Sequence, residues 1–386
     1  MNALRLTPLA FSLFALSLHS HAAEDFSNLL SQGKASLDAR YRYEYVDQDN
    51  LLNNANAQTL RTRLGFQSGK FHGLSALVEA DNVSRIGDAA YNSTRNGQSQ
   101  YSVVADPDGT EMNQALLRYD HTLGNLIGGR QRINLDNQRF IGSVAWRQNE
   151  QTFDGALGQL KPIENLTLTY AYIDNINSVF GPDNGRYASA ANPANIEGHS
   201  HLFNAQYQVA TELVITGYSY LLGLNNLALI ASGPTGTQSS KTSGVRLTGL
   251  VQGFSYAAEY ASQTDYADNP WSLDSDYYLG ELGYRLQTVA LKAGYEVLTG
   301  DSGPGARNQA FQTPLATKHA FQGWADVFLT TPIGGVEDAY LGASMPLLGG
   351  TAQAVYHDFS AQSSVSTGDD YGSEINLSYA HPIPGV

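Results

Sequence analysis

Segments of about ten residues in which apolar and polar side chains alternate constrain the fold of this chain more than any other feature. The clearest one runs from Ser36 to Val46, where Leu37 and Tyr41 fall on one face and Arg40 and Glu44 fall on the other. Successive side chains of a strand point to opposite faces, so each such segment has one apolar face and one polar face. The pattern recurs at 57–68, 71–83, 111–121, 123–132, 166–172, 201–209, 245–251, 254–263, 289–297 and 374–379.

A barrel that spans a membrane accounts for both faces, with lipid on the apolar side and a water-filled lumen on the polar side. We predict inner faces that are polar everywhere, whereas the core of a soluble sandwich would be dry. Short connections such as 68–71 alternate with long ones such as 83–111, as do the periplasmic turns and outer loops of bacterial barrels. The 38 glycines and 23 tyrosines suit antiparallel strands and aromatic belts at the membrane surfaces. The sequence therefore predicts an all-β fold, a transmembrane antiparallel up-and-down β-barrel.

The alternation of short and long connections also fixes the number of strands. Phe321 to Thr330 could be a strand by residue type, but counting it would put a long loop on the periplasmic side. We therefore place it within an outer loop at 300–335, folded inward, and count about 16 strands. The last residues, His381 to Val386, read as a proline turn rather than as the usual final strand with an aromatic end. We expect the domain at 23–386 to lack a C-terminal closing hairpin.

The first residues and the overall charge indicate where the protein works. Residues 1–22 carry an early arginine, an apolar run and small residues at the positions that a signal peptidase reads, which is the pattern of a cleaved secretory signal. After it, no apolar run reaches the roughly 20 residues of a transmembrane helix. There are no cysteines, and the net charge of −14 argues against a nucleic-acid partner. We predict localisation in the cell outer membrane.

Arginine is concentrated in the first part of the chain, above all in the stretch from Gly129 to Gly155. Its planar fork holds carboxylates and phosphates through pairs of hydrogen bonds. On the predicted strands, seven arginines point into the lumen and an eighth lies in the loop above them: Arg40, Arg42, Arg61, Arg63, Arg118, Arg130, Arg132 and Arg139. A row of weak cationic sites would concentrate anions and still release them.

Two structural alternatives stand beside this interpretation. The arginines could be ties within the wall, paired with inner-face acids such as Asp38 and Glu79, and the two roles can coexist. The loop at 133–147 could be an inward-folded constriction or an exposed outer loop. We also expect a field across the pore, from the arginines to an acidic far wall that comprises Glu259, Glu281, Glu296 and Glu374.

Five stretches resemble the alginate-export-like porin family of bacterial outer membranes: LDARYRYEYVDQDN (37–50), AQTLRTRLGFQSG (57–69), GRQRINLDNQRFIGSVAWRQNEQTFDG (129–155), FQGWADVFLTTPIGGVEDAYLGA (321–343) and YGSEINLSYAHPIPG (371–385). The resemblance extends over nearly all of the chain after the signal, and the arginine-rich stretch is its most specific part. It implies an 18-stranded barrel with an arginine-lined lumen that passes anionic sugars or similar solutes. About 16 of these strands are present in this chain.

The sequence thus predicts a porin for passive diffusion of anionic solutes, such as acidic sugars or oligosaccharides, that contacts membrane lipid and lipopolysaccharide and works as a monomer. A structural or adhesion barrel with a plugged lumen is the alternative. An outer-membrane enzyme is a further one, but the sequence has no GxSxG, HExxH or phosphate-loop motif, and His201 and His357 lack a recognisable serine partner. We expect no catalytic residues and no cofactor. The acidic run from Thr367 to Asp370 could bind a divalent ion, although such turns are usually just solvated.

Overall fold

The computed structural model describes residues 27–300, 307–364 and 368–383, so the predicted signal peptide at 1–22 lies outside the described residues. Its strands are β1 (Lys34–Val46), β2 (Ala55–Gln67), β3 (Leu74–Arg85), β4 (Gly109–His121), β5 (Gly124–Gln131), β6 (Thr152–Leu160), β7 (Leu166–Asn177), β8 (Asn195–Ala210), β9 (Leu213–Leu222), β10 (Ser240–Val251), β11 (Phe254–Asp265), β12 (Asp274–Leu286), β13 (Val289–Leu298), β14 (Val336–Leu347), β15 (Gly350–Ser360) and β16 (Asp370–Ala380). A single 3-10 turn, η1 (Lys318–Ala320), lies between β13 and β14. Among the described residues, no helix has the length and apolar character needed to cross a membrane.

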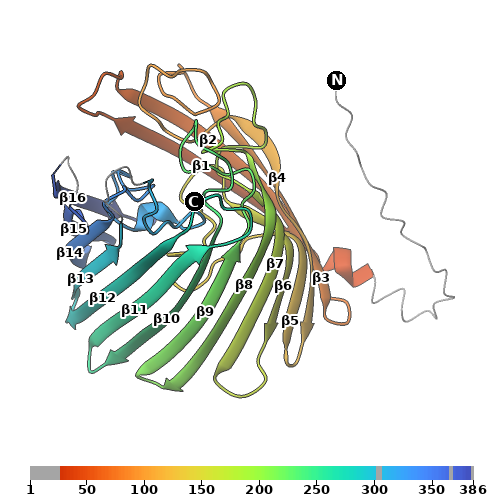
Figure 1. Ribbon diagram of the computed structural model, residues 1–386. Coiled ribbons are helices and arrows are strands. Elements are labelled where there is room, and N and C mark those ends of the chain that lie inside the picture. Colours follow the sequence, from red (N-terminus) through yellow and green to blue (C-terminus); the bar gives the residue numbers. More distant parts are fainter. Residues whose placement is uncertain (1–26, 301–306, 365–367, 384–386) are drawn as a thin grey trace.

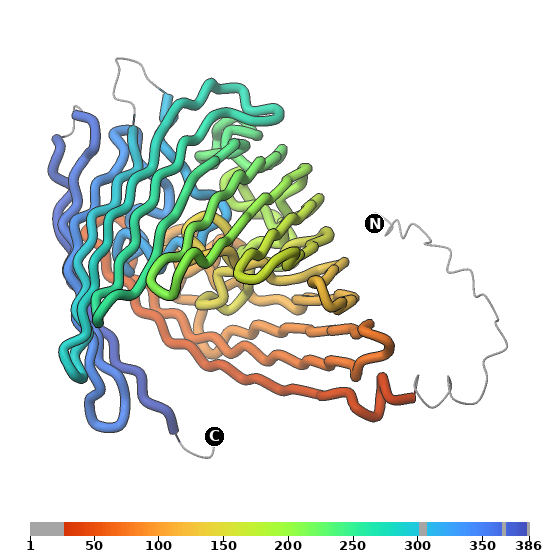
Figure 2. The backbone as a smooth tube through the Cα atoms, turned by 90° about the horizontal axis from the view of Figure 1, so that it is seen from below, coloured from red at the N-terminus to blue at the C-terminus, as the bar shows by residue number. Residues whose placement is uncertain are grey.

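All sixteen strands form one antiparallel sheet in which each strand pairs with its neighbours in the chain. This confirms the predicted up-and-down topology and the count of about 16 strands. The sheet curves around an interior, and β1 and β16 form its two edges (Figures 1 and 2). Within the described residues, β1 pairs only with β2 and β16 only with β15, so hydrogen bonds do not close the sheet.

Tight turns connect the strands at one end of the sheet. His72–Gly73, Gln252–Gly253 and Leu348–Gly349 are two-residue turns in which both residues have positive φ. This backbone matches the right-handed twist of the flanking strands, and glycine adopts it at the second position without strain. Because such turns fix the register, they keep the apolar face of each hairpin on one side.

The outer face of the sheet is apolar, as the alternation predicts. It exposes large side chains from strands all along the sheet, among them Tyr41, Leu64, Leu117, Leu126, Phe203, Leu282, Leu341 and Leu377. A soluble protein would bury such a surface, whereas lipid covers it in an outer-membrane barrel.

Two long loops from the other end fold back into the interior (Figure 1). The β5–β6 loop (132–151) contacts β1 on one side and β13 on the other, through Arg40–Gln148 and Arg139–Glu296. The β13–β14 loop (described for 307–335) includes η1 and contacts β16, where Glu374 accepts the backbone N–H of Trp324 at 2.5 Å. Phe321 to Thr330 forms no strand, as predicted.

The interior is less polar than the sequence pattern predicts. Inner-face residues of β7 to β12, such as Ile173, Leu202 and Tyr277, are fully buried in one cluster with Phe140 and Phe311 of the two inward loops. The prediction of inner faces that are polar everywhere is therefore wrong for this part of the sheet. The loops supply apolar side chains that displace water from the wall that they cover.

Candidate functional site

Five arginines gather on the inner face of the first strands, and we call them the arginine wall: Arg40 and Arg42 on β1, Arg61 and Arg63 on β2, and Arg132 just after β5. Alternation places the four arginine side chains of β1 and β2 on this face, and the register sets Arg40 directly beside Arg61. Like charges opposite each other on neighbouring strands destabilise a sheet unless counter-charges separate them. The structure supplies these counter-charges from β1, from β3 and from the loops.

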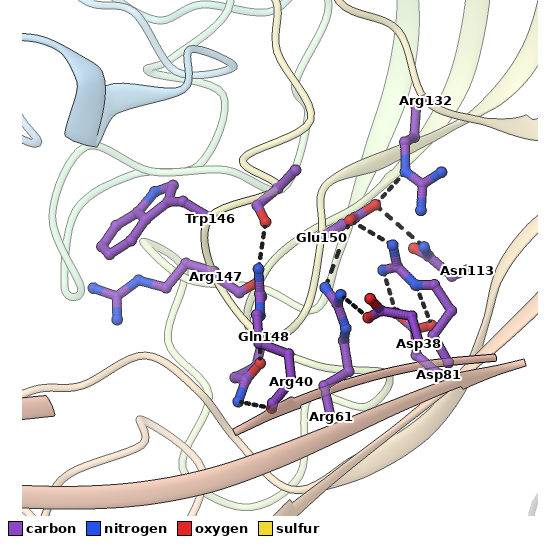
Figure 3. A network of polar contacts seen from close by, with 12 residues as sticks. Asp38, Arg40, Arg61, Asp81, Asn113, Arg132, Trp146, Arg147, Gln148 and Glu150 are labelled. Carbon is purple, nitrogen blue, oxygen red and sulfur yellow. Dashed lines mark hydrogen bonds and ion pairs between the residues drawn. The ribbon is translucent and has the colours of Figure 1, made fainter. Parts of the chain in front are cut away.

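Glu150 of the β5–β6 loop is the central counter-charge (Figure 3). Its carboxylate accepts Arg63 Nη1 at 2.8 Å and pairs with Arg132 Nε, and Arg61 Nη1 lies 3.8 Å away. Asn113 donates a further hydrogen bond of 3.2 Å. Burial would raise the pKa of Glu150, but the positive charges of Arg132 and Arg63 outweigh burial and hold this pKa below its ordinary value.

Asp106, from the loop between β3 and β4, is the counter-charge at the other end of the arginine wall. Its carboxylate lies 3.5 Å from Arg42 Nε and 3.8 Å from Arg147 Nη1, and it accepts the backbone N–H of Gln148 at 3.0 Å. Arg40 is different, because its guanidinium group donates to amide oxygens of a side chain and of the backbone, and not to a carboxylate. It donates Nε to Gln148 Oε1 at 3.0 Å and Nη1 to the carbonyl oxygen of Ala145 at 2.9 Å.

Within several of these pairs the cation is more exposed than the anion. The side chains of Arg132 and Arg42 are 27% and 17% exposed, whereas those of their partners Glu150 and Asp106 are 3% and 0% exposed. Arg63 likewise pairs with Asp81 of β3 at 2.6 Å, and their side chains are 11% and 0% exposed. In these pairs the guanidinium group therefore keeps more contact with solvent than its carboxylate does. A solute in the interior can reach Arg132 and Arg42 more readily than it can reach these acids.

A clasp joins the two inward loops next to this wall. The rings of Trp146 and His319 stack with their centroids 3.6 Å apart, and the guanidinium of Arg147 lies 4.1 Å from the centre of the Trp146 ring. Asp326 accepts from His319 Nδ1 at 2.9 Å and from Arg147 Nη2 at 3.4 Å. Stacking, cation–π attraction and ion pairing together fix one loop on the other.

Arg139 makes a second link between the loops. It donates Nε to Glu296 Oε1 of β13 at 2.7 Å, Nη1 to Thr313 Oγ1 at 3.1 Å and Nη2 to Gln322 Oε1 at 3.1 Å. Its side chain is only 1% exposed, so it does not line the open part of the interior as the sequence led us to expect. It instead ties the predicted constriction loop to the opposite wall, and that loop does fold inward.

Two other predicted site residues lie away from the arginine wall. Arg130 is on the outer face, because it shares the exposed side of β5 with Leu126 and pairs with Asp154 at 2.7 Å, so its predicted inward orientation is wrong. Arg118 faces inward and pairs with Asp120 at 2.7 Å, near the short-turn end. The structure thus brings together five of the eight predicted residues.

The predicted field across the pore is also wrong. Three of the four acids of the far wall have cationic partners, in the pairs Glu259–Arg246, Glu281–Lys292 and Glu296–Arg139, and Glu374 accepts backbone N–H groups. Acids likewise stand against four of the five guanidinium groups of the arginine wall. Opposite charges are therefore mixed on both sides of the interior. The sequence does not reveal this mixing of charges, because Asp106 and Glu150 come from loops, where no periodic pattern marks the direction of a side chain.

The two histidines named above lie on strands other than those of the arginine wall. His201 lies near the outer surface, 3.0 Å from the hydroxyl of Tyr170, and His357 pairs with Asp338 at 2.9 Å. Thr367 lies outside the described residues. Nowhere in the described parts of the chain do three His, Cys, Asp or Glu side chains gather in a way that could hold a metal ion.

Comparisons with known proteins agree with this architecture. A family model described as alginate export matches residues 31–328, which is more than half of the chain. A comparison with curated proteins gave no match.

Several solved structures share the fold at low sequence identity. OccK9 (OpdG) of Pseudomonas aeruginosa superposes with a TM-score of 0.67 at 16% identity, over 93% of this chain and 91% of that one. OccAB4 of Acinetobacter baumannii gives 0.61 at 15% identity, over 91% and 88% of the two chains. OpdK of Pseudomonas aeruginosa, solved with vanillate, gives 0.63 at 12% identity, over 91% and 88%. The likeness to these three structures extends over nearly the whole of this chain and shows a shared fold.

Proposed function

This chain belongs to the alginate export family, and on that premise we propose that it is an outer-membrane channel for passive diffusion of small anionic solutes, such as acidic sugars or oligosaccharides. The observation that carries the proposal is the unequal exposure of the ion pairs in the arginine wall. The guanidinium groups of Arg132 and Arg42 are partly exposed, whereas the carboxylates that they contact, those of Glu150 and Asp106, are buried. A passing carboxylate could replace bound water on Arg132 without displacing Glu150, and such weak, repeated contacts are what conduction requires.

Three further proposals rest on the sequence. Residues 1–22 are removed as a signal peptide, the mature chain contacts lipopolysaccharide, and it works as a monomer.

Replacing Arg132 by glutamine is expected to reduce the preference of the channel for anions. In water, one unit charge about 4 Å away contributes about 1 kcal/mol to the energy of an ion, which corresponds to about a five-fold change in occupancy. The measurement is the reversal potential of single channels in a planar bilayer under a salt gradient. Arg130→Gln is the matched control, since it removes the same charge two residues away but on the outer face. Equal shifts in both variants, or none in Arg132→Gln, would contradict the proposal.

The same preference should depend on pH through Lys318. Burial, followed by the nearby positive charge of Arg139, lowers the pKa of Lys318 to about 8. Because η1 carries this side chain into the interior, the channel loses one positive charge as the pH rises through about 8. We expect the anion preference to fall between pH 7 and pH 9, and this step to vanish in Lys318→Met. An unchanged pH profile in that variant would assign the titration to another group.

A structural barrel with a plugged lumen is the second candidate, and one observation favours it. The two inward loops and the inner faces of β7 to β12 form a continuous apolar core, which occupies part of the interior. This function predicts that the purified protein inserts into bilayers and gives no ion current. The planar-bilayer experiment therefore decides between the two candidates.

A further inference from the structure

A second polar site lies at the short-turn end of the interior, away from the arginine wall. It is a pocket of about 650 Å³ between the turn that joins β6 to β7 and the inner faces of β7 to β10. Its lining from the strands comprises Leu166, Thr167, Gln206, Gln208, Val214 and Thr248. Asn204 bonds to Asp136 of the inward β5–β6 loop at 2.9 Å, so Gln206 and Gln208, two and four residues further along β8, also face the interior.

Three polar side chains of this pocket have no hydrogen-bond partner among the described residues, in contrast to the paired arginines. Across the described residues, no side chain or backbone group bonds to the side-chain amides of Gln206 and Gln208, and both residues are exposed. The hydroxyl of Thr248 is equally unengaged by the described part of the chain. Each amide offers one acceptor oxygen and two donor hydrogens, and each hydroxyl offers both functions. The pocket is therefore a concave surface whose donors and acceptors point at open space.

The chemistry of the lining selects the kind of ligand. Amides and hydroxyls match neutral hydroxyl groups, which donate and accept in the same way, and they do not require a charge. Pro162, Ile163 and Val214 add apolar surface of the kind that the C–H face of a sugar ring can cover. Lys161 and Glu164, at the turn, carry opposite charges that offset each other.

The pocket also lies next to the charged part of the interior. Gln206 pairs in register with Thr216 of β9, and Thr216 pairs with Arg246 of β10, which is bound to Glu259. Thr248, which lines the pocket, lies two residues from Arg246 on the same face of β10, so the pocket borders this ion pair. We propose that it is a subsite for hydroxyl-rich saccharides, which holds a sugar ring through Gln206 and Gln208 on its way between the arginine wall and the periplasmic opening. This inference rests on the proposed function as a channel.

Block of ion current by a neutral sugar tests the subsite separately from charge selectivity. Maltotriose added on the short-turn side of single channels formed by the full chain should interrupt the current in a concentration-dependent way. Each lost hydrogen bond weakens binding by about 0.5–1.5 kcal/mol, so the double variant Gln206→Ala/Gln208→Ala should raise the half-blocking concentration about ten-fold. Gln353→Ala is the matched control. Gln353 is on the same face as the buried Val355 of β15, close to a short turn, but outside the pocket.

The outcomes separate this inference from the proposed function. Anion-selective channels that maltotriose does not block, or blocks equally in the wild type and the double variant, would overturn the subsite and leave the channel proposal intact. A sugar block that depends on the two glutamines in channels without anion preference would support the subsite and reject the anionic cargo. If no channels form, calorimetric titration of the detergent-solubilised protein with maltotriose decides. Binding that the double variant loses supports the subsite, and absence of binding in the wild type overturns it.

Discussion

Glu150→Gln should destabilise the barrel by about 3 to 5 kcal/mol, the range observed when one partner of a buried ion pair is removed. The replacement keeps the size and the hydrogen bond to Asn113 but deletes the charge that faces Arg61, Arg63 and Arg132. Arg61 should be affected most, since Asp38 is its only other carboxylate partner among the described residues. Urea unfolding measures the change in the free energy of unfolding, and the temperature at which the folded band disappears from a denaturing gel provides a second measure of stability. The anion preference of the channels that do form should increase.

Asp38→Asn is the matched control for this variant. Asp38 also pairs with Arg61, at 2.5 Å, but its side chain is 56% exposed. Exposed pairs contribute no more than about 1 kcal/mol, because water and salt screen them. Similar losses in the two variants would mean that burial does not determine the strength of these pairs, and that the arginine wall is not organised around Glu150.

The second large effect is expected from Arg139→Met, which should increase the single-channel conductance several-fold and also reduce stability. The variant removes three hydrogen bonds that hold the β5–β6 loop against β13 and the β13–β14 loop, and it leaves the buried carboxylate of Glu296 without its cation. Loss of one partner of a buried pair costs about 3 to 5 kcal/mol. We expect the loop to leave its place and the passage to widen, as measured by single-channel current at a fixed salt concentration.

Arg186→Met provides the comparison for this experiment, because Arg186 lies exposed in the loop between β7 and β8. The same chemical change there should leave both conductance and stability unaltered. An unchanged conductance in Arg139→Met, despite a loss of stability, would show that the clasp of Trp146 with His319 is sufficient to hold the loop.

Most of the fold was predictable because alternation is a local property. In β1 and β2 the side chains that alternate in the sequence also alternate in space, which identifies both the strands and the arginines that meet on the inner face. The same rule would have placed Arg130 correctly, since Arg130 lies on the face of Leu126 and Gly128. Arg132 points inward only because it follows the last residue of β5, where the alternation ends.

The interior could not be predicted in the same way. Asp106, Glu150 and Phe311 come from loops, and their positions depend on which distant segment each loop reaches. β-bulges add to this difficulty, as between Asp154 and Gly155 in β6, because an extra residue reverses the direction of the side chains that follow it.

The links between the two inward loops have a kinetic consequence. Arg139 and Gln322 are separated by 183 positions in the chain, and Arg147 and Asp326 by 179. Contacts between such distant segments form late, because the chain must first lose the entropy of closing the intervening loop. The strands can pair with their neighbours before either loop has found its place. Each newly assembled molecule should therefore pass through a brief stage in which the sheet is complete but the interior is unfilled, and during that stage it would leak solutes without discrimination.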